Sequence, residues 1–255
     1  MENFIVSARK YRPQEFDTVV GQSHVTDTLE HAIDNSQLAQ ALLFCGPRGV
    51  GKTTCARILA RKINEKSGAS DDSGFAFNIY ELDAASNNSV DDIRELIDQV
   101  RFAPQVGKFK VYIIDEVHML SAAAFNAFLK TLEEPPAHAI FILATTEKHK
   151  IIPTILSRCQ IYDFKRITIE DIQEHLRKIA DKEGVTYEDD ALFLIAQKAD
   201  GALRDALSIF DRLTTFTQKN ITLAKAAEVL NILDYDQYLN IVDLAKENNI
   251  PSILA

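Results

Sequence analysis

Residues 46–53 read GPRGVGKT, a spacing of glycine, lysine and threonine that suits a phosphate-binding loop. Glycines let the backbone turn tightly, so several N–H groups can face one anion beside a helix N-terminus. Lys52 is then expected to reach the outer phosphates, and the Thr53 hydroxyl to bind Mg²⁺. An apolar run precedes the loop and a helical pattern follows it, as such a site requires. The alternative is a chance glycine-rich turn. The residues expected to hold a nucleotide here are Gly46, Pro47, Arg48, Gly49, Val50, Gly51, Lys52, Thr53 and Thr54.

A second chemical feature is VYIIDEVHM, in which four apolar residues precede Asp115 and Glu116. Buried carboxylates are costly unless they are paired, so acids at the end of a buried strand need a partner. In a nucleotide site, the first acid would hold Mg²⁺ together with Thr53, and the second would orient and activate water. Many strands end in aspartate, but this pair lies downstream of a phosphate loop. We expect His118 to pack or to form a hydrogen bond rather than to act as a ligand, and we assign it no role.

Five apolar runs rich in β-branched and aromatic residues would position these groups. They span residues 41–44, 79–82, 110–115, 139–144 and 160–164. Such continuous runs are typical of strands that are covered on both faces. Amphipathic stretches lie between them: Ser89 and Asp92 form a predicted capping box, and a helix after Ser121 ends at Pro135-Pro136. This alternation predicts an α/β fold with a doubly wound, parallel five-stranded sheet.

The pattern becomes helical near residue 165. Thr168 and Asp171 form a predicted capping box, and Gly184 is the expected C-cap of the same helix. Further helical patterns without a strand signal cover residues 189–199, 202–217 and 222–231. We therefore predict three parts, namely a nucleotide-binding core at 1–164, a small all-helical domain at 165–234 and the start of another helical part at 235–255.

The composition narrows the possible functions. A formal net charge of −9 argues against non-specific coating of nucleic acid by the whole chain, although it allows a local basic patch. No apolar run is long enough to cross a membrane, and the N-terminus shows no secretory signal. The three cysteines lack short paired spacing, so we expect neither a disulfide framework nor a zinc site. A reducing cytoplasm is the expected location.

Taken together, the motifs resemble those of the AAA+ ATPases and, more narrowly, the γ/τ subunits of bacterial DNA polymerase III clamp loaders. Within AAA+ proteins, TILSRC together with LEEPP is specific to clamp loaders, and RKYRP with LRDALS favours γ/τ over non-hydrolysing partner subunits. The similar segments run from residue 8 to about 211. They are ARKYRPQEFDTVVGQ, GPRGVGKTTCARILA, ELDAASNNSVDDIRELIDQV, VYIIDEVHML, FNAFLKTLEEPP, ATTEKHKIIPTILSRCQ and GALRDALSIFD.

The resemblance implies three further roles in the ATP site. Thr146 matches the first sensor, a polar residue between the paired acids and the γ-phosphate. Arg158 matches the arginine finger, which places positive charge on the nucleotide of a neighbouring subunit. Arg204 matches the second sensor on the helical lid. Without the family, Thr146 would be interpreted as a threonine that is hydrogen-bonded to the backbone. Arg158 would be expected to form a surface ion pair, and Arg204 a salt bridge with Asp200 or Asp205.

Two other segments are assigned only through the resemblance. Tyr11, Val19 and Val20 match the part that wraps adenine, although plain core packing explains the two valines equally well. Arg94 and Arg101 lie on the helix whose counterpart faces DNA in clamp loaders. A solvated helix face is the commoner explanation for both arginines.

The implied function is that of an ATP-binding and hydrolysing motor, with ATP and Mg²⁺ as cofactors. It would open a sliding clamp and load it onto primer–template DNA within a ring of clamp-loader subunits. Nucleotidyl transfer would belong only to the polymerase III holoenzyme. We expect the present chain by itself to be monomeric. The alternatives are a non-hydrolysing structural clamp-loader subunit and another AAA+ DNA motor, such as a Holliday-junction branch-migration ATPase.

The sequence departs from the family in two places. The family usually carries a four-cysteine zinc module where this chain has residues 64–78, which contain no cysteine and are expected to form a surface loop. The family's third domain, a helical collar, would begin near residue 235 and continues here for only about one helix. The helical domain at 165–234 would be the lid.

Overall fold

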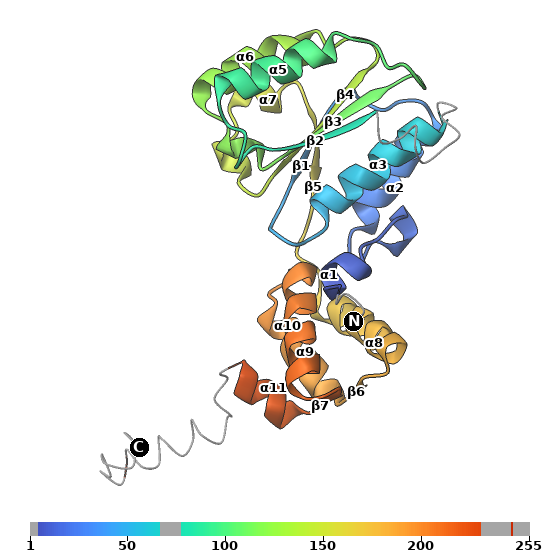
Figure 1. Cartoon of the computed structure of the whole chain (residues 1–255), viewed down its shortest axis with the longest axis vertical. Helices are drawn as coiled ribbons and strands as arrows, with labels where there is room; N and C mark the ends of the chain where they lie inside the picture. The colour runs from blue at the N-terminus through green and yellow to red at the C-terminus, as the bar shows by residue number, and fades with distance from the viewer. Residues whose placement is uncertain (1–4, 67–77, 231–245, 247–255) are drawn as a thin grey trace. The chain divides into compact units, whose positions relative to one another are not determined.

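The computed structural model describes residues 5–66, 78–230 and 246 (Figure 1). They divide into two compact units. The larger unit is Arg9–Ile167, and the smaller begins at Thr168 and includes the N-terminal residues up to Ala8. The domain limits expected at residues 164 and 234 remain predictions, and the expected collar helix falls almost entirely outside the described residues. Among the described residues, no helix combines the length and the apolar character needed to span a membrane.

A parallel sheet of five strands, in the order β2-β3-β4-β1-β5, forms the centre of the larger unit (Figure 1). All five predicted strands are present, and none differs from its predicted bounds by more than one residue at its carboxyl end. The strands are β1 (Ala41–Cys45), β2 (Ile79–Asp83), β3 (Lys110–Asp115), β4 (Ala139–Thr145) and β5 (Gln160–Asp163).

Helices cover both faces of this sheet, because successive strand residues point to opposite sides. Leu42 and Phe44 of β1 pack in one apolar cluster with α2 and α3, whereas Leu43 and Cys45 pack in a second cluster with α5, α6 and α7. This is the doubly wound α/β arrangement predicted from the sequence. The helices and 3₁₀ turns before Thr168 are α1 (Ser7–Lys10), η1 (Phe16–Thr18), α2 (Ser23–Asp34), α3 (Lys52–Lys66), α5 (Val90–Val100), η2 (Val117–Met119), α6 (Ala122–Glu133), η3 (Lys148–Lys150) and α7 (Pro153–Leu156).

The predicted caps set the ends of several helices. At α5, the Asp92 N–H donates to Ser89 Oγ at 3.2 Å, and the Ser89 N–H donates to Asp92 Oδ2 at 3.1 Å, which completes the capping box. Ser121 Oγ accepts from the Ala124 N–H at 3.2 Å at the start of α6. That helix ends at Glu133, before the proline pair. Local sequence signals therefore decide where these helices begin and end.

The loop expected at residues 64–78 starts later than predicted, because α3 continues to Lys66. Asn64 is fully buried, and its amide nitrogen donates to Ala60 O at 2.9 Å. Asn78 in turn donates to Asn64 Oδ1 at 3.2 Å. Because these hydrogen bonds satisfy the buried side chain, a polar residue can lie inside the helix. The polar composition therefore placed the start of the loop too early. Residues 67–77 lie outside the described residues.

In residues 168–230, the smaller unit is helical apart from one short pair of strands, which the sequence did not predict. Thr186–Tyr187 (β6) pairs with Asn220–Ile221 (β7), each only two residues long, so no period-2 pattern could reveal them. Ser7 Oγ and the Ser7 N–H both donate to the carboxylate of Asp211 on α10. The helices are α8 (Ile169–Glu183), α9 (Asp189–Lys198), α10 (Leu203–Phe216) and α11 (Leu223–Val229).

Candidate active site

The loop between β1 and α3 has the backbone of a phosphate-binding turn. Gly46, Gly49 and Gly51 take φ values of 151°, 76° and 107°, which side-chain-bearing residues rarely adopt. Val50 is 2 % exposed and anchors the loop in the apolar cluster beneath it. The glycines therefore allow the turn while Val50 fixes its position. The positive φ values explain why glycine stands at these three positions of the loop.

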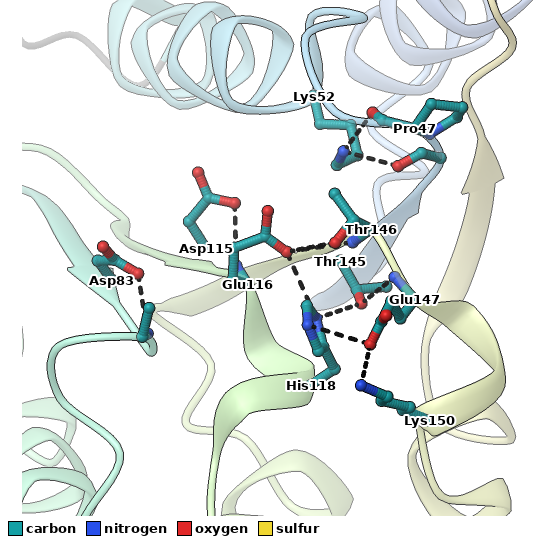
Figure 2. Close-up of polar contacts among 12 residues, drawn as sticks. Pro47, Lys52, Asp83, Asp115, Glu116, His118, Thr145, Thr146, Glu147 and Lys150 are labelled. Atoms are coloured by element: carbon teal, nitrogen blue, oxygen red, sulfur yellow. Dashed lines mark hydrogen bonds and ion pairs between the residues drawn. The ribbon is translucent and has the colours of Figure 1, made fainter.

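Lys52 is the first residue of α3, and its side chain reaches back into this loop. Its side-chain Nζ donates to Gly46 O and to Pro47 O, both at 2.7 Å (Figure 2), and the residue is 6 % exposed. A buried ammonium needs such partners because desolvation of an unpaired charge is costly. The contacts hold a positive charge among the loop's own carbonyls. This is the place where the outer phosphates of a nucleotide would meet the loop.

Thr53, in the first turn of α3, and Asp115, at the carboxyl end of β3, come together although they lie 62 positions apart in the sequence. Thr53 Oγ1 donates to Asp115 Oδ2 at 2.6 Å, and Asp115 Oδ1 accepts from the Glu116 N–H at 2.9 Å. A hydroxyl and a carboxylate are oxygen ligands of the kind that Mg²⁺ takes in phosphate sites, where it keeps several waters. Among the described residues, no cluster of three or more His, Cys, Asp or Glu is suited to a metal. The pair fits an ion held jointly with phosphate oxygens.

Glu116 follows at the end of β3 in a left-handed conformation, with φ 48° and ψ 44°. For a residue other than glycine this costs roughly 1–2 kcal/mol, so the surrounding structure must impose it. The Thr146 N–H and Oγ1 donate to Glu116 Oε2 at 3.2 and 2.9 Å (Figure 2). The residue expected to be the first sensor therefore contacts the acid expected to orient water.

An unexpected residue, Gln22, ties three segments of the site together. It is fully buried, and its Nε2 donates to Lys165 O at 2.7 Å and to Val50 O at 3.4 Å. Its Oε1 accepts from the Lys165 N–H at 3.2 Å. Gln22 thereby joins the DTVVGQ segment to the phosphate loop and to the chain after β5. The sequence signal was present in that segment, but no spacing rule assigned the glutamine a role.

The expected adenine-side residues lie in the larger unit. Val19 packs against the cluster under the phosphate loop, and its Cγ1 would lie 4.0 Å from a Cβ placed on Gly51. Val20 and Tyr11 are half-buried, and the Lys10 ammonium lies 5.5 Å from the Tyr11 ring centre. Val19 thus lies beside the loop and packs against the core. Its position allows contact with adenine and also serves core packing.

The expected arginine finger is engaged within its own chain. Arg158 donates to Glu133 Oε1 at 2.5 Å and to Thr154 O at 2.7 Å, which is the surface ion pair that the sequence left open. Arg204 is an exposed residue in the first turn of α10, in the smaller unit.

Arg94 on α5 and Arg101, the C-cap residue directly after it, each pair with an aspartate three residues earlier. Both are exposed on the helix surface. These contacts are what a solvated helix face provides.

Cys45 is the thiol nearest to the loop, at the end of β1. Burial raises its pKa to about 11, so at neutral pH it is the protonated thiol and a poor nucleophile. Cys45 therefore adds no nucleophile to the candidate site.

Gly46 offers a test of the loop's packing. A Cβ at this position would lie 2.4 Å from Phe164 O, a backbone atom that cannot simply rotate away. We expect Gly46→Ala to lower the free energy of unfolding by about 1–3 kcal/mol, measured by urea denaturation without nucleotide. Gly51→Ala is the matched control, because a Cβ there would meet only Val19, at 4.0 Å. Equal losses in the two variants would show that backbone φ, and not the clash, limits position 46.

Two family models match the chain. The model described as "DNA polymerase III, delta subunit" matches residues 21–168. The model described as "DNA polymerase III clamp loader subunit, ATPase lid domain" matches residues 171–219.

Curated relatives extend over nearly the whole chain. DNA polymerase III subunit tau of Bacillus subtilis is 48 % identical over 93 % of this chain, which spans 44 % of that relative. Subunit tau of Escherichia coli is 42 % identical over 99 % of this chain and 41 % of the relative. Subunit gamma of Buchnera aphidicola subsp. Baizongia pistaciae is 40 % identical, with 99 % of this chain and 71 % of the relative covered. The chain thus spans less than half the length of the two tau subunits.

Among solved structures, the Thermotoga maritima RuvB Holliday junction branch migration motor aligns with a TM-score of 0.67. The alignment covers 94 % of this chain and 80 % of the RuvB chain, and the two sequences are 22 % identical. At this identity the likeness shows that the two chains share a fold and nothing about the activity.

Proposed function

Because the chain belongs to the γ/τ family of DNA polymerase III clamp-loader subunits, we propose that it is an ATP-binding and hydrolysing motor subunit. The observation that supports this most is the convergence of three elements at one edge of the sheet. Lys52 lies in the glycine loop, Thr53 meets Asp115 at 2.6 Å, and Glu116 follows at the end of β3. A subunit that served only as a scaffold would have no need of this combination.

In this proposal, Lys52 and the loop N–H groups bind the β- and γ-phosphates of ATP. Thr53 and Asp115 would hold Mg²⁺, which would neutralise charge on the phosphates. Glu116 orients a water molecule toward the γ-phosphorus and accepts its proton at a carboxylate oxygen. Water adds its oxygen to the γ-phosphoryl group as the bond to ADP breaks. Thr146 holds the Glu116 side chain during this step through its two hydrogen bonds.

The partners proposed for the full-length protein are other clamp-loader subunits in a ring, a sliding clamp and primer–template DNA. ATP binding would set the conformation that opens the clamp, and hydrolysis after DNA binding would release it. Arg204 would approach the phosphates from the lid, and Tyr11, Val19 and Val20 would contact adenine. Arg158 would leave Glu133 and act on a neighbour's nucleotide, since fixed positive charge stabilises the transferring phosphoryl group.

The test uses the full-length chain assembled with partner subunits. The complex is mixed with clamp and primer–template DNA, and phosphate release is followed with and without each addition. We expect hydrolysis that needs Lys52 and is stimulated by DNA together with the clamp. A complex that loads clamps while this chain binds no ATP would identify a structural subunit. Hydrolysis indifferent to the clamp would indicate another kind of DNA motor.

Two site variants can show whether Arg158 acts in trans. We expect complexes built only from Lys52→Ala chains, or only from Arg158→Ala chains, to lose about 10³-fold or more in hydrolysis. A complex that contains both variants should regain measurable hydrolysis, because a Lys52→Ala chain still supplies the finger to an intact neighbouring loop. If the mixed complex is as inactive as the two complexes of single variants, Arg158 acts on the nucleotide of its own chain or serves only to form the ion pair with Glu133.

The non-hydrolysing alternative has one observation in its favour, since the model that matches residues 21–168 is described as a delta subunit. Against it stand the side chains that we propose for hydrolysis, since Lys52 reaches into the glycine loop, Thr53 lies 2.6 Å from Asp115, and Glu116 follows at the end of β3. Tight, magnesium-dependent ATP binding without turnover in the assembled complex would favour this alternative.

A further inference from the structure

His118 is a buried histidine beside Glu116 that the proposed reaction does not use. The left-handed turn at Glu116 starts the short 3₁₀ turn η2, which carries His118. The His118 side chain is 7 % exposed. Figure 2 shows its ring below the Glu116 carboxylate, facing the chain that follows β4. Buried polar atoms usually have hydrogen-bond partners, and here each ring nitrogen lies within 3.5 Å of a glutamate carboxylate oxygen.

One ring nitrogen faces the acid and the sheet. Nδ1 lies 3.0 Å from Thr145 Oγ1 in a hydrogen bond and 3.4 Å from Glu116 Oε2. The same Oε2 accepts the two hydrogen bonds from Thr146. Figure 2 shows the other Glu116 oxygen pointing away from this group. The contacts therefore gather on one carboxylate oxygen and leave the other directed toward the phosphate loop side.

The second ring nitrogen faces a different acid. Nε2 lies 3.5 Å from Glu147 Oε2, and Glu147 forms an ion pair with Lys150. The hydrogen bond from Lys150 lowers the pKa of Glu147, so it is ionised at neutral pH. The Glu147 N–H also donates to Thr145 Oγ1 at 3.0 Å. The imidazole is thus held on both sides, which fixes the plane of the ring.

We propose that His118 is a positioning residue that sets the direction of the Glu116 carboxylate through its Nδ1 side. A glutamate side chain has several rotatable bonds, and an acid that orients water must be held close to one geometry. Thr146 restrains one oxygen, and the fixed ring of His118 prevents the carboxylate from rotating about that contact. The inference rests on the proposed function, in which Glu116 acts on water.

The test compares three substitutions of His118 in the full-length chain within the DNA-stimulated complex. Asparagine places an amide near the position of Nδ1, whereas glutamine reaches the position of Nε2. We expect His118→Ala to lower kcat about 10–100-fold, the range for partners that orient functional ligands, with the dissociation constant for Mg·ATP changed less than about threefold. His118→Asn should recover most of the lost rate, and His118→Gln should not. Equal rates for the asparagine and glutamine variants, or a wild-type rate for alanine, would overturn the proposal.

A double-mutant cycle separates this inference from the proposed function. If His118 acts through Glu116, His118→Ala adds nothing further in a Glu116→Gln background. A wild-type rate of hydrolysis in Glu116→Gln would contradict the proposed function itself. A lower rate in Glu116→Gln with a wild-type rate in His118→Ala would contradict only the inference about His118. Independent losses of rate that add up in the double variant would also contradict this inference.

Thr145→Val is a second variant in case the buried histidine substitutions do not fold. Valine keeps the shape of the fully buried threonine and removes the hydroxyl that holds Nδ1. We expect a several-fold lower kcat with unchanged nucleotide affinity, and an unchanged kcat would contradict the proposal. His138→Asn is the matched control, because His138 bonds Val100 O at the opposite end of β4 and should leave hydrolysis unchanged.

Discussion

Lys52→Ala is expected to weaken Mg·ATP binding by about 100-fold or more. The loss of one ammonium removes charge-assisted hydrogen bonds to phosphate, each worth about 1.5–3 kcal/mol, and every 1.4 kcal/mol is about a factor of ten in affinity. Lys52 is 6 % exposed, and its ammonium group lies against the carbonyls of the glycine loop. Binding is measured by titration with a fluorescent ATP analogue, and hydrolysis by phosphate release.

The control for this variant is Lys62→Ala. Lys62 lies on the same helix, α3, but it pairs with Glu30 and Glu15 away from the loop. We expect it to bind nucleotide normally, with at most a small change in stability because such exposed pairs contribute little. An unchanged affinity in Lys52→Ala would mean that the glycine loop does not hold the phosphates, and the proposed function would fail with it.

Glu116→Gln is expected to separate binding from chemistry. Glutamine keeps the shape of the side chain and an oxygen that accepts from Thr146, but it takes up no proton from water. General-base catalysis contributes about 10²–10⁴-fold, so kcat should fall by about that factor. The affinity for Mg·ATP should stay close to that of the wild type, because Lys52, Thr53 and Asp115 are unchanged. Single-turnover hydrolysis and equilibrium binding, measured on the same preparation, test both statements.

Glu134→Gln serves as the comparison for Glu116→Gln. Glu134 is an exposed acid at the end of α6, and its substitution makes the same change of charge outside the site. A wild-type rate in both variants would show that Glu116 does not activate water. A large loss of ATP affinity in Glu116→Gln would instead assign this residue to binding.

Most of the fold follows from patterns in short stretches of sequence. The five strands were predictable because each is a compact apolar run between turn signals, and Ser89 and Ser121 marked helix starts through their caps. The exceptions have local causes. Asn64 was predicted as a loop residue because it is polar, and its hydrogen-bond partner Asn78 lies 14 positions further along the chain. The strands β6 and β7 are each too short to show an alternating pattern.

The residues of the candidate site were chosen by type, because phosphate and magnesium chemistry requires particular side chains at particular strand ends. Lys52, Thr53, Asp115 and Glu116 were all chosen in this way. The sequence could not assign partners to Arg158 or to His118. Glu133 and Glu147, which face them, are two of many acids in the chain, and no spacing distinguishes them.

The sequence alone indicated the chemistry that we propose for this chain, since the glycine loop and the paired acids are local motifs whose residue types suit particular roles. Only the tertiary structure decided which side chains meet. Thr53 reaches Asp115 over 62 residues, and Gln22 reaches Lys165 over 143 residues. Such contacts depend on how the strands are ordered in the sheet and how the helices pack on it. That order is a property of the whole core, so no single segment encodes it.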